Sequence, residues 1–210
     1  QKYIKNKYEV DVWVNKPSED KQGDTSSWKI SIIKEANRPD LPRQKMHIDV
    51  CAIPSFDIEK RVLINHYNIV VPTEGLLIPV QSLKETLADK FIALAYRARR
   101  IKPRDIWDIL WIHQRGINTS LDLIDKKLKA RGKAKDDFVE VLRMQVDKLM
   151  QDDEIQNDFN AEMSRFVPKQ VKERTIDNPE YWAYVQSEIK NISAPLLNAG
   201  KSKNKFDMGL

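Results

Sequence analysis

Three short segments of the sequence carry ionisable residues at spacings that could serve chemistry. The first, Lys45–Ile53 (KMHIDVCAI), alternates in polarity, so Lys45, His47 and Asp49 should share one face of a β-strand. Their Cβ atoms would then lie about 7 Å apart along the strand. Three such residues form either the floor of an active site or a solvated surface, and the solvated surface is the commoner case.

Lys90 and Arg97 are spaced i, i+7 in the second segment, so they point the same way from a helix. Between Lys84 and Arg104, seven basic residues stand against two acidic ones, which gives this stretch a net charge of +5, equal to that of the whole chain. Such a patch attracts phosphate groups. The alternative is a solvated, arginine-rich helix end in which Lys90 pairs with a nearby carboxylate.

The third segment, Arg104–Ile109 (RDIWDI), places Asp105 and Asp108 near the start of a helix. The helix dipole, worth roughly 0.3–1 kcal/mol for each, would alone explain acidic residues there. Beside Arg104, the same two carboxylates could also orient a base, a phosphate or a metal ion. The short connection 99–102 predicts an antiparallel helix pair that brings Lys90 within reach of Asp105.

Alternating apolar residues predict the strands that position Asp49. They lie at Tyr8–Val14, Trp28–Ile33 and Lys45–Ile53, and the long polar loops between them favour an antiparallel or mixed sheet. Three short apolar pieces follow before the chain turns helical: Val62–Ile64, Ile69–Val71 and Leu76–Val80.

Helical periodicity begins at Ser82, which with Glu85 matches a capping box, where each side chain binds a backbone N–H of the other. This helix should run to about Arg99 and bury a stripe made of Leu83, Leu87, Phe91 and Leu94. The next should run from Pro103 to Gly116 and bury Ile106, Ile109 and Leu110. Four more helices are predicted: Ser120–Arg131, Asp137–Met150, Asp153–Phe166 and Pro179–Ile192.

The predicted fold class is therefore α+β, with a small antiparallel or mixed sheet followed by a C-terminal helical bundle. We expect an α+β domain at residues 1–116 and a helical bundle domain at 117–197. The basic tail at 198–210 should be flexible or held by a partner.

Composition excludes several classes of protein. No apolar run approaches the roughly 20 residues that span a bilayer, so we expect no membrane protein, and the first residues do not resemble a signal peptide. The single cysteine, Cys51, excludes an internal disulfide and fits a reducing cytoplasm. Three scattered histidines and one cysteine disfavour zinc, so a bound metal would have oxygen ligands.

Three ordered strings, HIDVCAIP, SLKETLADKFIAL and RIKPRDIWDIL, resemble the AbiEii/AbiGii-type nucleotidyltransferase toxins, which are polymerase-β-like. In that family a strand ending in an acidic residue precedes a helix of the form ExLADK, and a helix opening with RD and a second aspartate follows. The resemblance spans roughly Lys45 to Gln114. It implies that the predicted sheet is of nucleotidyltransferase type.

The resemblance also implies roles for individual residues. The candidate catalytic residues are Asp49, Lys90 and Asp105. Asp49 matches a carboxylate that would bind Mg²⁺, Lys90 a lysine that contacts nucleotide phosphates, and Asp105 the acidic residue of the RD motif. Five further residues are expected to bind substrate, from their facing direction or their neighbours: Lys45, His47, Arg97, Arg104 and Asp108.

The sequence departs from the family in one respect. Family members carry a glycine-rich loop and a DxD strand, which hold the triphosphate and divalent metal. Neither occurs here, and Glu9-Val10-Asp11 is the nearest acidic pair. Either an N-terminal part of the protein precedes this chain or the protein is a degenerate member. We favour the first, because the chain is predicted to open directly in a strand.

The leading hypothesis is a cytoplasmic nucleotidyltransferase of a toxin–antitoxin or phage-defence system. It would transfer a nucleoside monophosphate from a nucleoside triphosphate to an acceptor such as tRNA or another RNA, with an antitoxin protein as partner. The alternatives are a catalytically inactive protein that binds nucleic acid or a partner, and a helical adaptor. The leading hypothesis requires that Asp49, Lys90 and Asp105 share one cleft.

Overall fold

The computed structural model describes residues 2–18, 24–33, 35, 38, 40–65, 69–97 and 99–199. The chain divides into two compact units, Gln1–Pro54 and Ser55–Leu210. The second unit therefore contains both the helices that carry Lys90 and Asp105 and the later helices. The predicted division into domains 1–116 and 117–197 stays a prediction, and most of the expected basic tail, 200–210, lies outside the described residues.

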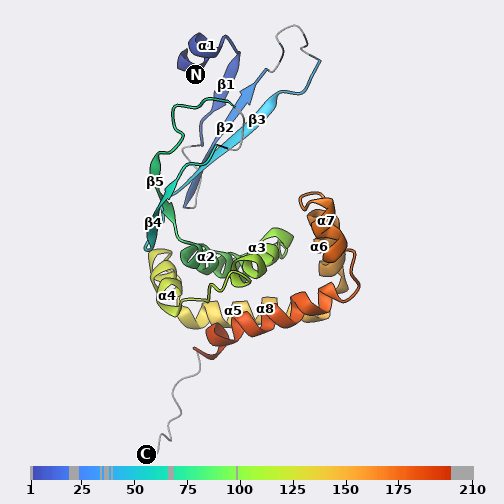
Figure 1. Cartoon of the computed structure of the whole chain (residues 1–210). Coiled ribbons are helices and arrows are strands. Elements are labelled where there is room, and N and C mark those ends of the chain that lie inside the picture. The colour runs from blue at the N-terminus through green and yellow to red at the C-terminus, as the bar shows by residue number, and fades with distance from the viewer. Residues whose placement is uncertain are drawn as a thin grey trace, which may run out of the picture. The chain divides into compact units, whose positions relative to one another are not determined.

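The first unit contains an antiparallel sheet in the order β1 (Val12–Asn15), β2 (Thr25–Ile32), β3 (Gln44–Cys51), preceded by helix α1 (Lys2–Tyr8) (Figure 1). The prediction of a strand from Tyr8, and hence of a chain that opens in a strand, is wrong. No glycine or proline interrupts the first residues, so they form a helix that ends where Glu9 adopts a φ of 52°. The strand begins three residues later.

The register of this sheet confirms the predicted alternation on β3. Trp28 lies opposite Ile48 and Ile30 opposite Met46, which builds an apolar face. On the other face Ser27 lies opposite Asp49. Lys45, His47 and Asp49 therefore share the polar face, because residues at alternate positions of a strand point to the same side.

The second unit begins with an antiparallel pair of strands, β4 (Ile58–Val62) and β5 (Leu77–Gln81), and the second of these overlaps the predicted apolar piece Leu76–Val80. Seven helices follow in its described part: α2 (Leu83–Tyr96), α3 (Pro103–His113), α4 (Leu121–Ala130), α5 (Lys135–Gln151), α6 (Asp153–Met163), α7 (Lys169–Arg174) and α8 (Tyr181–Asn198). The α+β fold class with a C-terminal helical region is confirmed. Among the residues described, no helix has the length and apolar character needed to cross a bilayer.

The core of the second unit forms around α2, which packs against α3, α4 and α5, while α8 lies alongside α5 (Figure 1). The predicted stripe is confirmed at Leu87, Phe91 and Leu94, whereas Leu83 is half-buried. Three residues predicted to be buried on α3 are buried: Ile106, Ile109 and Leu110.

The C-terminal helices depart from prediction at two places. The short helix α7 was not predicted, and α8 continues beyond the predicted end at Ile192 to Asn198. Pro195 lies inside α8 and removes one backbone hydrogen bond. Leu196 is buried in the core, so the burial of the last turn offsets the loss of that bond.

Candidate active site

Helices α2 and α3 bring four of the predicted residues into one ion-pair cluster. Lys90 Nζ lies 3.1 Å from Asp105 Oδ1 and 2.6 Å from Asp108 Oδ2. Arg97 Nε lies 2.5 Å from Asp105 Oδ2. The prediction that the two helices place Lys90 near Asp105 is confirmed. We call these four residues, Lys90, Arg97, Asp105 and Asp108, the Lys90 cluster.

Local sequence explains why the cluster forms. Arg97 leaves the helical conformation as the C-cap of α2, and Pro103, with its fixed φ, starts α3 after a short connection. Asp105 and Asp108 then lie one turn apart near the start of α3, where the helix dipole favours carboxylates. The helix-dipole explanation therefore fits both carboxylates, and the pairing of Lys90 with a nearby carboxylate is observed, whereas a role in orienting a base, a phosphate or a metal ion stays a prediction.

One side of the Lys90 cluster is buried and the other side is exposed to solvent. The Asp105 side chain is only 4% exposed, and both of its oxygens accept from cations. The Lys90 side chain is 26% exposed and that of Asp108 is 41% exposed. Solvent therefore reaches Lys90 on the Asp108 side, whereas the Asp105 carboxylate is buried.

The electrostatic balance keeps Lys90 charged. Burial of the ammonium group lowers its pKa, but hydrogen bonds to Asp108 and Asp105 outweigh burial, so the pKa of Lys90 lies above its ordinary value. Lys90 is thus an ammonium group at neutral pH. It can bind an anion but has no free electron pair with which to accept a proton.

Arg104 does not join the Lys90 cluster. Its Nε lies 3.1 Å from Glu162 on α6, and its guanidinium group lies 3.8 Å from the centroid of the Phe166 ring. Arg100, in the connection between α2 and α3, pairs with Asp158 and Glu162. The predicted basic stretch is therefore split between two sites.

The other predicted residues belong to the first unit. Asp49 Oδ1 accepts a hydrogen bond of 2.5 Å from Ser27 Oγ, and Lys45 and His47 are exposed on the same face of β3. Lys90 and Asp105 belong to the second unit. A cleft shared by Asp49, Lys90 and Asp105 stays a prediction.

The described residues do not by themselves form a magnesium site. Within 2–18, 24–65 and 69–199, apart from the undescribed positions in those ranges, no group of three or more His, Cys, Asp or Glu side chains could hold a metal. Asp105 and Asp108 already bind cations, and Asp49 is the one carboxylate among the strand residues of its sheet face. Mg²⁺ at Asp49 stays a prediction that requires further oxygen ligands.

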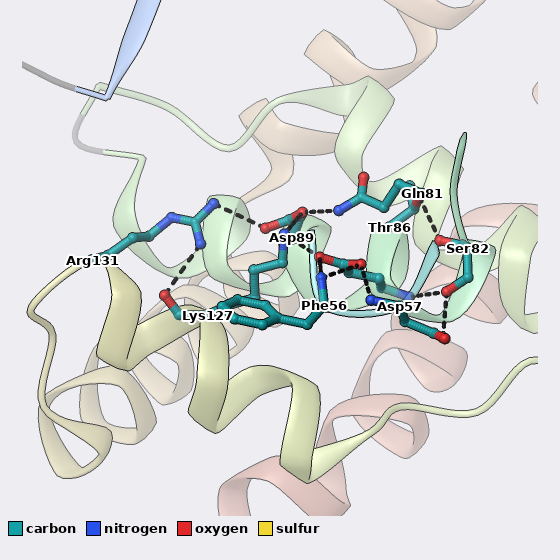
Figure 2. A network of polar contacts seen from close by, with 9 residues as sticks. Phe56, Asp57, Gln81, Ser82, Thr86, Asp89, Lys127 and Arg131 are labelled. Atoms are coloured by element: carbon teal, nitrogen blue, oxygen red, sulfur yellow. Dashed lines mark hydrogen bonds and ion pairs between the residues drawn. The ribbon is translucent and has the colours of Figure 1, made fainter. Parts of the chain in front are cut away.

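A second ion-pair network on α2 was not predicted (Figure 2). Lys127 Nζ, on α4, lies 2.5 Å from Glu85 Oε1 and 3.0 Å from Asp89 Oδ2, and Arg131 lies 2.9 Å from Asp89 Oδ1. Gln81 donates to Asp89 at 2.6 Å. We call Glu85, Asp89, Lys127 and Arg131 the Glu85 network.

The same network corrects the predicted capping box. Ser82 Oγ accepts from the backbone N–H of Glu85 at 3.0 Å, as predicted. The Glu85 carboxylate does not return to Ser82. It accepts instead from the backbone N–H groups of Phe56 and Asp57, at 2.7–3.0 Å, while the Ser82 N–H donates to the Asp57 carbonyl. Residues 56–57, which precede β4, therefore supply the N–H donors for the Glu85 carboxylate, in place of the N–H of Ser82 that a capping box would use.

Glu85 is ionised although it is fully buried. Burial alone raises the pKa of this carboxyl, but hydrogen bonds from Lys127 and from the N–H groups of Phe56 and Asp57 hold the pKa below its ordinary value. One signal in the sequence pointed to the network. Two acids on α2 and two bases on α4 are each spaced i, i+4.

These observations define a class of protein: an α+β chain in which two adjacent helices carry a cluster of lysine and aspartate side chains. The sequence matches the family described as Nucleotidyl transferase AbiEii toxin, Type IV TA system, over residues 1–187, so the chain belongs to this family of nucleotidyltransferase-like toxins. Membership implies a nucleoside triphosphate substrate and an antitoxin partner. No curated protein and no solved structure matches the chain.

Proposed function

We propose that this protein transfers a nucleoside monophosphate from a nucleoside triphosphate to a hydroxyl group of an RNA acceptor, with tRNA as the leading candidate. The Lys90 cluster carries this proposal. It presents an ammonium group that is charged at neutral pH and partly exposed, and that is paired with the buried Asp105 carboxylate.

A triphosphate would bind by replacing one carboxylate of the cluster. Asp108 is the more exposed partner of Lys90, so phosphate oxygens compete with it first. Asp105 keeps its bonds to Lys90 and Arg97, because it is buried and both of its oxygens are used. We therefore assign Asp105 the role of a positioning residue that aims the two cations.

The reaction forms one bond and breaks one. The acceptor hydroxyl oxygen attacks the α-phosphorus, the bond from that phosphorus to the β-phosphate oxygen breaks, and pyrophosphate leaves with the electron pair. The hydroxyl proton passes to water. Lys90 and Arg97 stabilise the negative charge that grows on the phosphate oxygens, which is the main task of a protein in phosphoryl transfer.

The proposal is tested by incubating the whole protein with labelled nucleoside triphosphates, Mg²⁺ and total tRNA. Lys90→Ala should lower label transfer by about 100-fold or more. Asp105→Asn should lower it by about tenfold or more, because the cations lose their anchor. Lys84→Ala, which removes an exposed lysine from the same helix, is the matched control and should leave transfer unchanged.

Transfer that is insensitive to both Lys90→Ala and Asp105→Asn would show that the Lys90 cluster does not carry the reaction, and it would reject the enzymatic proposal. Binding of RNA without transfer, by a correctly folded protein, would support the alternative of a catalytically inactive binding protein on the same scaffold. Far-ultraviolet circular dichroism of each variant separates a lost site from a lost fold.

A further inference from the structure

The start of α3 and the side of α6 enclose a second charged site, distinct from the Lys90 cluster. It is a hollow of about 410 Å³ with four basic side chains, Arg100, Lys102, Arg104 and Arg165, and two acidic ones, Asp158 and Glu162. All of it lies within the second unit, and its net charge is +2. We infer that this hollow binds backbone phosphates in a single-stranded end of the RNA acceptor, an inference that rests on the proposed function.

The charges in the hollow are incompletely balanced. Arg100 pairs with both acids and Arg104 with Glu162. Among the described residues, Lys102 and Arg165 form no ion pair, and both are exposed. Arg104 uses only Nε towards Glu162, so its terminal nitrogens remain available as donors. Two unpaired cations and a guanidinium group with spare donors suit a phosphate.

The backbone of α3 adds to this field. The helix begins after Lys102 without a side-chain cap, and Lys102 lines the hollow, so the amino end of α3, with its partial positive charge, lies beside it. The helix end alone would not define a site. Here it reinforces side chains that already line a hollow.

An aromatic ring at the edge favours a nucleic acid over a free anion. Phe166 lines the hollow and is 54% exposed, and the Arg104 guanidinium group lies over its ring. Cations beside an exposed aromatic ring are the combination that holds single strands, in which bases stack while phosphates bind cations. A small inorganic anion would make no use of Phe166.

Position on α3 links the hollow to the proposed reaction. Arg104 and Asp108 are spaced i, i+4, so they lie on one side of the helix about 5–6 Å apart at their Cβ atoms. Arg104 lines the hollow, and Asp108 contacts Lys90. An RNA end that reacts at Lys90 would therefore reach the hollow with a neighbouring phosphate.

The decisive experiment measures binding of a short, fluorescein-labelled single-stranded RNA of mixed sequence by anisotropy, over a range of NaCl concentrations and without nucleotide. The double variant Lys102→Ala/Arg165→Ala should weaken binding by about fivefold or more at low salt. The slope of log affinity against log salt should become shallower by about 0.7 for each phosphate that the variant no longer neutralises. Lys129→Ala/Lys190→Ala removes two exposed lysines from α4 and α8 and should change neither quantity.

Phe166→Ala provides an independent reading. It should weaken RNA binding while leaving the salt slope unchanged, because stacking releases no counterions. Binding of a labelled ATP analogue should be the same in all of these variants, because the Lys90 cluster is intact.

Several results would overturn the inference. These are equal RNA affinity in the Lys102/Arg165 variant and its control, no RNA binding by the unaltered protein, or an acidic peptide of matched charge that binds as tightly with the same dependence on Lys102 and Arg165. The last result would assign the hollow to an acidic protein partner. Failure of nucleotide transfer with intact, Lys102-dependent RNA binding would instead reject the proposed function and leave the hollow as an RNA site.

Discussion

Helix α2 takes part in two four-residue networks of two acids and two bases that differ in their access to solvent. In the Glu85 network, the side chains of Glu85 and Lys127 are 0% and 3% exposed, and backbone N–H groups supply the remaining bonds to Glu85. In the Lys90 cluster, only Asp105 is buried to that degree, and Asp108 faces solvent.

Under the proposed function, this difference separates a structural role for the Glu85 network from a binding role for the Lys90 cluster. A buried charge that has lost its partner is costly, so Glu85 and Lys127 must keep each other as partners, and the network joins residues 56–57, α2 and α4. Under the proposed function, the Lys90 cluster would exchange Asp108, which is 41% exposed, for a phosphate and would leave no buried charge without a partner. We therefore propose that two networks with the same numbers of acids and bases, both attached to α2, serve different purposes because their central charges differ in burial.

The largest effect should follow from breaking the buried network. Lys127→Met leaves Glu85 as an unpaired buried charge and should lower the free energy of unfolding by about 3–5 kcal/mol. Chemical denaturation of Lys127→Met and of Lys126→Met, its exposed neighbour, measures the difference, and the neighbour should change stability by less than about 1 kcal/mol. Equal effects of the two substitutions would contradict the burial argument. Adding Glu85→Gln to Lys127→Met should restore part of the loss.

Asp105→Asn should have the next largest effect. It removes the charge shared by Lys90 and Arg97, but both cations are partly solvated and can be hydrated. We expect a loss of about 1–2 kcal/mol in the free energy of unfolding, together with the loss of transfer described above. A variant as unstable as Lys127→Met would show that the Lys90 cluster is as structural as the Glu85 network.

Acid and alkali should distinguish the two networks. The pKa of Glu85 is lower in the folded state, so its stabilisation is complete above the ordinary pKa of 4.5 and is lost as the pH falls through the folded pKa. The pKa of Lys90 is higher in the folded state, so its stabilisation is complete below 10.5 and is lost as the pH rises through the folded pKa.

The free energy of unfolding, measured from acid to alkaline pH, tests both predictions: its decrease at acid pH (the acid limb) and its decrease at alkaline pH (the alkaline limb). Glu85→Gln should flatten the acid limb alone, and Lys90→Met should flatten the alkaline limb alone. Tyr96 and Tyr181, whose pKa values burial raises to about 12, also contribute above pH 10, so the alkaline comparison must be made between Lys90→Met and the unaltered protein. A Lys90→Met variant with an unchanged alkaline limb would contradict the pKa assigned to Lys90.

The smallest effect should come from the open edge of the cluster. Asp108→Asn removes a half-exposed partner of Lys90 and should cost less than about 1 kcal/mol, an amount that added salt reduces further. It should also tighten binding of a labelled ATP analogue, because a competitor for Lys90 is gone. Weaker nucleotide binding in this variant would mean that Asp108 assists the substrate rather than competing with it.

Sequence periodicity predicted much of the helical framework and the contact between Lys90 on α2 and Asp105 on α3. Three features were sufficient to predict the contact with Asp105: the spacing of Lys90 and Arg97, the start of α3 at Pro103, and the short connection between α2 and α3. All of these are local features, in which helix geometry converts spacing into direction. The capping-box prediction failed at Glu85 because a distant segment, 56–57, offered better donors than the helix's own first turn.

By itself the sequence determined the element types over most of the chain, the polar face that carries Asp49, and the family. Only the tertiary structure decided which acids and bases meet in the Glu85 network. Glu85 and Lys127 are 42 residues apart, as are Asp89 and Arg131, and no local rule joins them. The reason is physical. Periodicity fixes the side of a helix on which a charge lies, whereas its partner, its burial and therefore its role depend on the helices packed against that side.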